Sequence, residues 1–163
     1  MDAGDVKERK VVIAMDGSTH SEYAFNWYLN SFRLPRDLVL LVHCIERHDR
    51  FHAALGMSDV KTICDILAQE EKEEQLLKKQ LEKRLIDHKL TGTVKTGVGK
   101  PGELIVSAAR HEKADLIVCG CRGVGKVRRT ITGSVSDFIV HHSHVPVIVC
   151  RHPSHLHELK DQN

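Results

Sequence analysis

Glycines and cations gather between residues 120 and 134, and their spacing predicts a phosphate-binding segment. The glycines follow the pattern G-x2-G-x9-G-S, from Gly120 through Gly123 to Gly133-Ser134, directly after the apolar run 116–119. Glycine lets a ligand approach the backbone closely, and a Gly-Ser pair that opens a helix offers N–H groups and a hydroxyl to an anion. The cations between the first and last glycine are Arg122, Lys126, Arg128 and Arg129, and no acidic residue accompanies them.

Short apolar runs alternate along the chain with helix-like segments, which is typical of parallel strands joined by helices. The expected strands are residues 11–15, 38–45, 93–98, 115–120 and 145–150. The expected helices begin at Ser18 or Thr19 (with Glu22 completing a capping box), near residue 59, at Pro101 and at Gly133-Ser134. Right-handed crossovers then give an α/β fold: a doubly wound, five-stranded parallel sheet of order 3-2-1-4-5 with helices on both faces.

The predicted topology places a ligand cleft between the first and fourth strands, because open α/β sheets bind ligands beyond the strand ends where the strand order reverses. Asp16 lies at one lip of this cleft and Gly120 at the other. We expect the Asp16 carboxylate to accept hydrogen bonds from ribose hydroxyls; the alternative is an Asx-turn or a helix cap. For Gly120 and Gly123 the alternative to close ligand approach is a loop that needs positive φ.

The phosphate end of the predicted site is the start of the last helix. Ser134 offers its N–H and its hydroxyl to phosphate, helped by the helix dipole, and its alternative role is a plain N-cap. The Val135 N–H and Ser136 are secondary candidates. Among the loop cations, Arg122 and Lys126 are the candidates to neutralise phosphate, together with the two following arginines.

Composition narrows the class of protein. The chain has 163 residues and a net charge of +2, which predicts one soluble domain without a nucleic-acid or membrane footprint. No run approaches the ~20 apolar residues that span a bilayer, and the polar stretch 1–10 lacks a secretory signal core, so we expect a cytoplasmic protein. The 12 histidines match no zinc spacing, and no metal site is predicted.

Catalytic motifs are not found in the sequence. There is no G-x-S-x-G nucleophile elbow, and Val127 replaces the Ser/Thr that a P-loop requires after Lys126. No catalytic residue is therefore predicted.

Several segments together resemble the universal stress protein family, especially its eukaryotic single-domain members. They are residues 12–18, 41–44 and 114–118, the glycine segment with Gly133-Ser134-Val135-Ser136, and residues 146–149. The resemblance covers roughly residues 9–151, with a flexible N-terminus at 1–8 and a polar tail at 152–163 outside it.

The resemblance implies the ATP-binding subclass, and we expect Mg²⁺ to accompany the triphosphate. It places ribose at Asp16, adenine at the backbone around Ala14, Met15 and Cys44, and Cys119 as an apolar wall near the base. Phosphates and ribose lie along Gly120, Gly123, Gly133, Ser134 and Val135. The family also implies a homodimer through the last strand, with contacts at Val145, Val147 and Val149.

The predicted function is a cytoplasmic ATP-binding stress-response module that acts as a nucleotide-dependent switch, with at most slow ATP hydrolysis. One alternative is a nucleotide-free dimeric interaction protein. A less favoured one is an enzyme of the adenylyl-transfer or nucleotide α-hydrolase group, which needs a phosphate loop such as S-G-G-x-D-S where this chain has residues 16–21.

Overall fold

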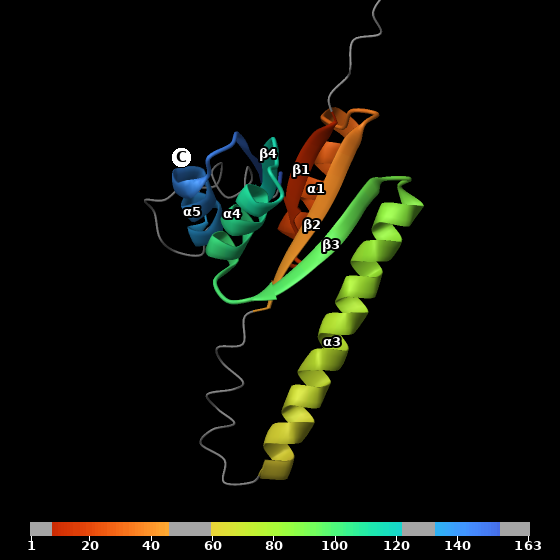
Figure 1. Ribbon diagram of the computed structural model, residues 1–163, viewed down its shortest axis with the longest axis vertical. Helices are drawn as coiled ribbons and strands as arrows, with labels where there is room; N and C mark the ends of the chain where they lie inside the picture. Colours follow the sequence, from red (N-terminus) through yellow and green to blue (C-terminus); the bar gives the residue numbers. More distant parts are fainter. Residues whose placement is uncertain (1–7, 46–59, 122–132, 154–163) are drawn as a thin grey trace, which may run out of the picture.

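The computed structural model describes residues 8–45, 60–121 and 133–153 (Figure 1). The predicted N-terminus at 1–8 and polar tail at 152–163 lie almost wholly outside these residues. The elements are β1 (Arg9–Ala14), α1 (Thr19–Ser31), β2 (Asp37–Ile45), α3 (Val60–Asp87), β3 (Thr91–Val98), α4 (Pro101–His111), β4 (Leu116–Cys121), α5 (Ser134–His142) and β5 (Val147–Arg151). The strands form one parallel sheet of order β3-β2-β1-β4-β5, which confirms the predicted topology.

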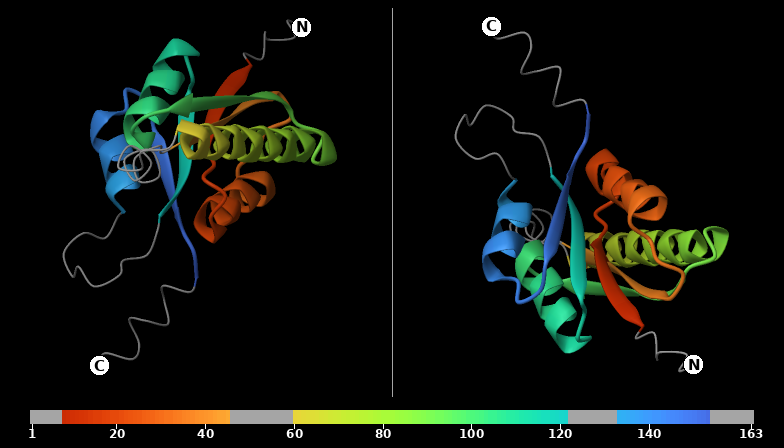
Figure 2. Two further views of the ribbon diagram at one scale, coloured as in Figure 1. Left: turned by 90° about the horizontal axis from the view of Figure 1, so that it is seen from below. Right: turned by 90° about the horizontal axis from the view of Figure 1, so that it is seen from above.

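Helices cover both faces of the sheet, and each face has its own core. Successive residues of β1 point to opposite faces, so Val11 and Ile13 pack in the core beneath α1 while Val12 packs beneath α4. The α3 residues Leu81 and Leu85 join the α1 core. Figure 2 shows α4 and α5 side by side on the face opposite α1.

The start of α1 differs from the expected capping box. Ser18 is the N-cap, and its Oγ accepts a hydrogen bond from the Ser21 N–H at 3.3 Å. The Glu22 carboxylate does not reach back to complete a box with Thr19, because it pairs with Arg84 of α3. The capping-box prediction is therefore wrong, and the glutamate joins two helices.

Strand β5 begins two residues later than predicted. Pro146 has no N–H to donate. Its carbonyl accepts from the Ile117 N–H at 3.0 Å, and the paired strand starts at Val147. Val145 lies before the strand, where its N–H donates to the Ser143 Oγ at 3.1 Å.

Helix α3 is longer than the sheet that it covers. It spans 28 residues and runs well past the end of β3 (Figure 1), but only Leu81 and Leu85 in its last turns are buried. None of the helices in the described residues is long and apolar enough to cross a membrane.

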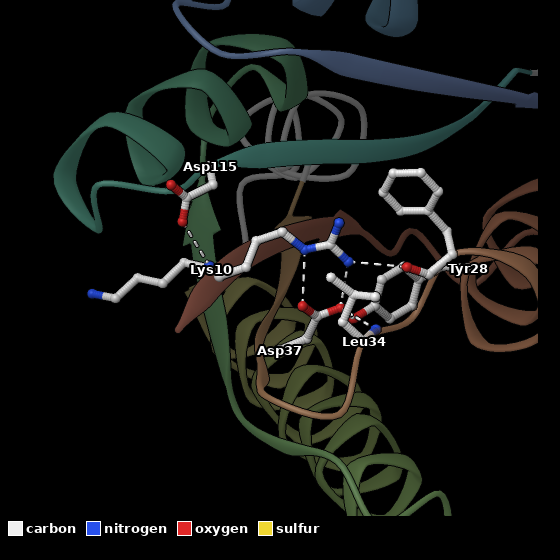
Figure 3. Close-up of polar contacts among 7 residues, drawn as sticks. Lys10, Tyr28, Leu34, Asp37 and Asp115 are labelled. Carbon is white, nitrogen blue, oxygen red and sulfur yellow. Dashed lines mark hydrogen bonds and ion pairs between the residues drawn. The ribbon is translucent and has the colours of Figure 1, made fainter. Parts of the chain in front are cut away.

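A buried carboxylate joins the amino-terminal ends of β1 and β2 to the end of α1 (Figure 3). The Asp37 side chain is 1% exposed. It accepts from Arg9 Nε at 2.8 Å and from a terminal Arg9 nitrogen at 2.6 Å. It also accepts from the Tyr28 hydroxyl at 2.6 Å and from the Leu34 N–H at 2.9 Å.

These contacts shift the pKa values of the groups involved. Burial acts to raise the pKa of Asp37, but hydrogen bonds from Arg9, the Leu34 N–H and Tyr28 together hold it below its ordinary value. Burial and the hydrogen bond to Asp37 raise the pKa of the Tyr28 hydroxyl. Arg9 and Asp37 are therefore an ion pair at neutral pH.

Candidate functional site

A cleft opens at the carboxyl ends of β1 and β4, where the strand order reverses. It lies between the β1–α1 connection, the end of β2 and the first turns of α4 and α5. Its open space is about 750 Å³, including the part that opens to solvent. The cleft is at the place that the topology predicts for a ligand.

Every predicted site residue within the described ranges lines this cleft. They are Ala14, Met15, Asp16, Cys44, Cys119, Gly120, Gly133, Ser134, Val135 and Ser136. The remaining candidates, Arg122, Gly123 and Lys126, lie outside the described residues, as do Arg128 and Arg129. The cleft also has walls that sequence reasoning did not predict, formed by Ser18, His20, Ser21, Val42, Pro101 and Ile105.

The Asp16 carboxylate lies at the rim, and the turn that the sequence offered as an alternative role is formed. Its Oδ1 accepts from the Ser18 N–H at 2.9 Å, and Gly17 between them has φ +77°. This Asx-turn uses one of the several hydrogen bonds that an ionised carboxylate can accept. The turn and a ribose contact are therefore compatible.

Met15, the residue before Asp16, is held by β2. Its side chain is buried, its N–H donates to the Val42 carbonyl at 2.8 Å, and its carbonyl lies 2.8 Å from His43 Nδ1. With its N–H engaged, Met15 offers the cleft apolar surface rather than a backbone donor.

Gly120 is required by packing within the protein. It does not have the positive φ that Gly17 and Gly99 have. A Cβ placed on Gly120 would lie 2.6 Å from the His20 carbonyl carbon and 3.0 Å from the Ser21 nitrogen. The missing side chain therefore lets the first turn of α1 pack against the end of β4, a reason that sequence reasoning did not consider.

The start of α5 presents backbone donors to the cleft. Gly133 is the N-cap, with φ −63° and ψ 158°, a conformation open to any residue, so backbone strain does not require glycine there. The first N–H groups of a helix have no acceptor within it, and here they belong to Ser134, Val135 and Ser136. The Ser134 side chain is exposed, whereas the buried Ser136 hydroxyl donates to the Gly133 carbonyl at 3.0 Å.

Part of the cleft lining is apolar. Val42, Ile105 and the buried Cys119 form this part. Burial raises the pKa of the Cys119 thiol to about 12, with smaller contributions from the neighbouring cysteines, so it is neutral at physiological pH. The Cys44 thiol donates to the Gly99 carbonyl at 3.1 Å. The lining of the cleft thus combines apolar side chains with the backbone donors at the start of α5.

The lining residues that were not predicted lie at the starts of helices whose positions the sequence does predict. Ser18, His20 and Ser21 directly follow Asp16 and form the first turn of α1, while Pro101 opens α4. Helix starts at the carboxyl edge of the sheet are the signal that could have identified them. Within the described residues, no three His, Cys, Asp or Glu side chains gather as metal ligands would.

Comparison with known proteins finds relatives that this chain matches over most of their length, and solved structures of the same fold. A universal stress protein of Thermus aquaticus, from the QAH/OAS sulfhydrylase 3′ region, is 31% identical over 151 residues, covering 88% of this chain and 98% of that protein. The structure of an Arabidopsis thaliana universal stress family protein with AMP bound has a TM-score of 0.64 and 20% identity, covering 88% and 91% of the two chains. A universal stress protein in complex with cAMP has a TM-score of 0.58 and 21% identity, covering 87% and 96%.

The family model of the universal stress proteins matches residues 8–151, which include all the described elements of the sheet and of the cleft. Together with the full-length relative at 31% identity, this match shows that the chain belongs to the universal stress protein family.

Proposed function

We propose that this chain is a cytosolic adenine-nucleotide-binding protein that holds ATP in the cleft between β1 and β4, as a single-domain member of the ATP-binding subclass. It acts as a nucleotide-dependent module in a stress response and at most hydrolyses ATP slowly. Two copies associate through β5, at Val147 and Val149, with Val145 adjacent.

The observation that carries this proposal is that one cleft combines an apolar lining with the start of a helix and a carboxylate. The first-turn N–H groups of α5, behind a glycine N-cap, suit the phosphates of a nucleotide. Val42, Ile105 and Cys119 suit the base. Asp16 lies at the rim, where a ribose would connect base and phosphate. The relatives solved with AMP and with cAMP make adenine the base to test first.

The residues present fit a nucleotide better than a protein-held metal. Asp16 is the one carboxylate among the described residues that line the cleft, and one of its oxygens serves the Asx-turn. Mg²⁺ commonly keeps several waters and binds through substrate phosphates plus one or two carboxylates. We therefore expect Mg²⁺ to enter with ATP, held mainly by phosphate.

A nucleotide-free interaction protein is the second candidate, and specific contacts favour it. The Asx-turn gives Asp16 a role without ribose, and the packing of α1 explains Gly120 without a ligand. Neither contact explains Gly133, whose backbone conformation does not need glycine. The start of α5 at the cleft, with its first-turn N–H groups, makes the nucleotide the better proposal.

The deciding experiment is mass analysis of small molecules released from freshly purified, denatured protein, followed by calorimetric titration of nucleotide-free protein with ATP, AMP, cAMP and GTP. We expect adenine nucleotides to bind and GTP to bind more weakly. The test variant is Gly133→Val, and the matched control is Ser107→Val, which places the same side chain on an exposed position of α4 away from the cleft. Absence of adenine-nucleotide binding by the folded wild-type protein would favour the interaction protein.

A further inference from the structure

His43 does not line the cleft, but it contacts a residue that does. It lies near the end of β2, half-buried, and its Nδ1 is 2.8 Å from the carbonyl oxygen of Met15, 28 residues away in the sequence. A carbonyl oxygen only accepts hydrogen bonds, so the Nδ1 atom must carry the proton in this contact.

The contact fixes the point at which the chain leaves the sheet. Strand β1 ends at Ala14, and the Met15 N–H makes one more bond, to the Val42 carbonyl at 2.8 Å. Met15 is therefore held on both sides, by a backbone acceptor through its N–H and by the His43 side chain through its carbonyl. The peptide group is planar from one Cα atom to the next. Fixing the Met15 carbonyl therefore also fixes the orientation of the Asp16 N–H and the direction to the Asp16 Cα atom.

We infer that His43 is a positioning residue: through its hydrogen bond to the Met15 carbonyl, it sets the place of the Asp16 carboxylate at the rim of the cleft. The inference rests on the proposed nucleotide site. His43 itself is not among the residues that line the cleft.

The next residue of β2 makes an equivalent contact on the other face. The Cys44 thiol donates to the Gly99 carbonyl at 3.1 Å, just before Lys100, the N-cap of α4. Because successive strand residues point to opposite faces, the end of β2 holds one connection on each side of the sheet. Both connections lead into helices whose first turns line the cleft.

The test uses two variants of His43 and two probes. His43→Leu removes the donor, whereas His43→Asn keeps an N–H donor close to the position of Nδ1. The probes are ATP and 2′,3′-dideoxy-ATP, which lacks the hydroxyls expected to meet Asp16. We expect His43→Leu to weaken ATP binding about tenfold, as for one hydrogen bond of about 1.4 kcal/mol. It should change binding of the dideoxy analogue less than twofold, and His43→Asn should bind ATP within about threefold of wild type.

Unchanged ATP affinity in His43→Leu would overturn the inference, as would equal losses for both probes or failure of the asparagine variant to restore binding. If wild-type protein binds the dideoxy analogue as tightly as ATP, Asp16 does not meet ribose and the inference falls while the nucleotide site stands. If wild type binds neither probe, the proposed function falls as well. Should His43→Leu not fold, nitrogen NMR of the wild type gives the result: an imidazole protonated only on Nε2 would refute the contact.

Discussion

Replacement of Gly120 by alanine adds one methyl group at the tightest point between α1 and β4. The nearest atoms to the new Cβ are backbone atoms of the first turn of α1: the His20 carbonyl oxygen, then its carbon at 2.6 Å and the Ser21 nitrogen at 3.0 Å. Backbone atoms cannot rotate aside as a flexible side chain can. The helix start must therefore move away from the strand by several tenths of an ångström or more.

The size of the effect follows from this overlap. Inserting a methyl group into a well-packed region typically costs ~1–3 kcal/mol. For a chain of this length, 1 kcal/mol corresponds to ~2–4 °C in the midpoint of thermal unfolding. We therefore expect Gly120→Ala to lower the midpoint by roughly 2–12 °C, on those same conversions. Nucleotide binding should weaken as well, because Ser18, His20 and Ser21 move with the helix start.

The assay is thermal and urea-induced unfolding of wild type, Gly120→Ala and Gly133→Ala, each without nucleotide and then with ATP. Gly133→Ala is the matched control, since φ −63° and ψ 158° accept alanine without strain. Its midpoint without nucleotide should stay near that of wild type. A Gly120→Ala protein as stable as wild type that nevertheless loses ATP binding would refute the packing argument and return Gly120 to a ligand role.

Three further predictions concern the same molecule. Gly133→Val should weaken ATP binding at least tenfold in calorimetric titration while the unfolding midpoint stays near wild type, because its side chain crowds the phosphate end. Asp16→Ala should cost ~1.5–3 kcal/mol of ATP binding, as for a hydrogen bond to an ionised group; a much smaller loss would assign Asp16 to its turn alone. Asp37→Asn should lower the free energy of unfolding by about 3 kcal/mol, because it leaves Arg9 without its buried partner. Since the folded-state pKa of Asp37 is lowered, this difference from wild type should be complete at neutral pH and shrink as pH falls below about 4; a gap that widens in acid would contradict the ion pair.

The strand order and the location of the cleft could be predicted from the sequence because both depend on patterns that act over short stretches. Buried apolar runs such as that of β4 identify strands, and right-handed crossovers leave few ways to order them. Asp16 follows the end of β1 and Gly120 lies near the end of β4, and both line the cleft because these two strands are neighbours in the sheet.

Contacts between distant parts of the chain explain where the prediction failed. Glu22 fits a capping box locally, but Arg84 lies 62 residues further along the chain and takes its carboxylate. The approach of α1 to Gly120 and the contact of His43 with Met15 likewise depend on the assembled sheet. No local pattern reveals which residue will lie beside another in these cases.

The glycines of the G-x2-G-x9-G-S pattern therefore do not carry equal information about a ligand. Gly120 is needed to let α1 pack against β4, and that need exists whether or not a nucleotide binds. Gly133 has a backbone conformation that any residue can adopt. If glycine is favoured there, the reason is therefore another group that lies close to its Cα atom. A chain that keeps Gly120 but carries a branched residue at the position of Gly133 should keep this fold and lose the phosphate end of the cleft. Gly133 is thus the position at which we expect a substitution to separate nucleotide binding from packing.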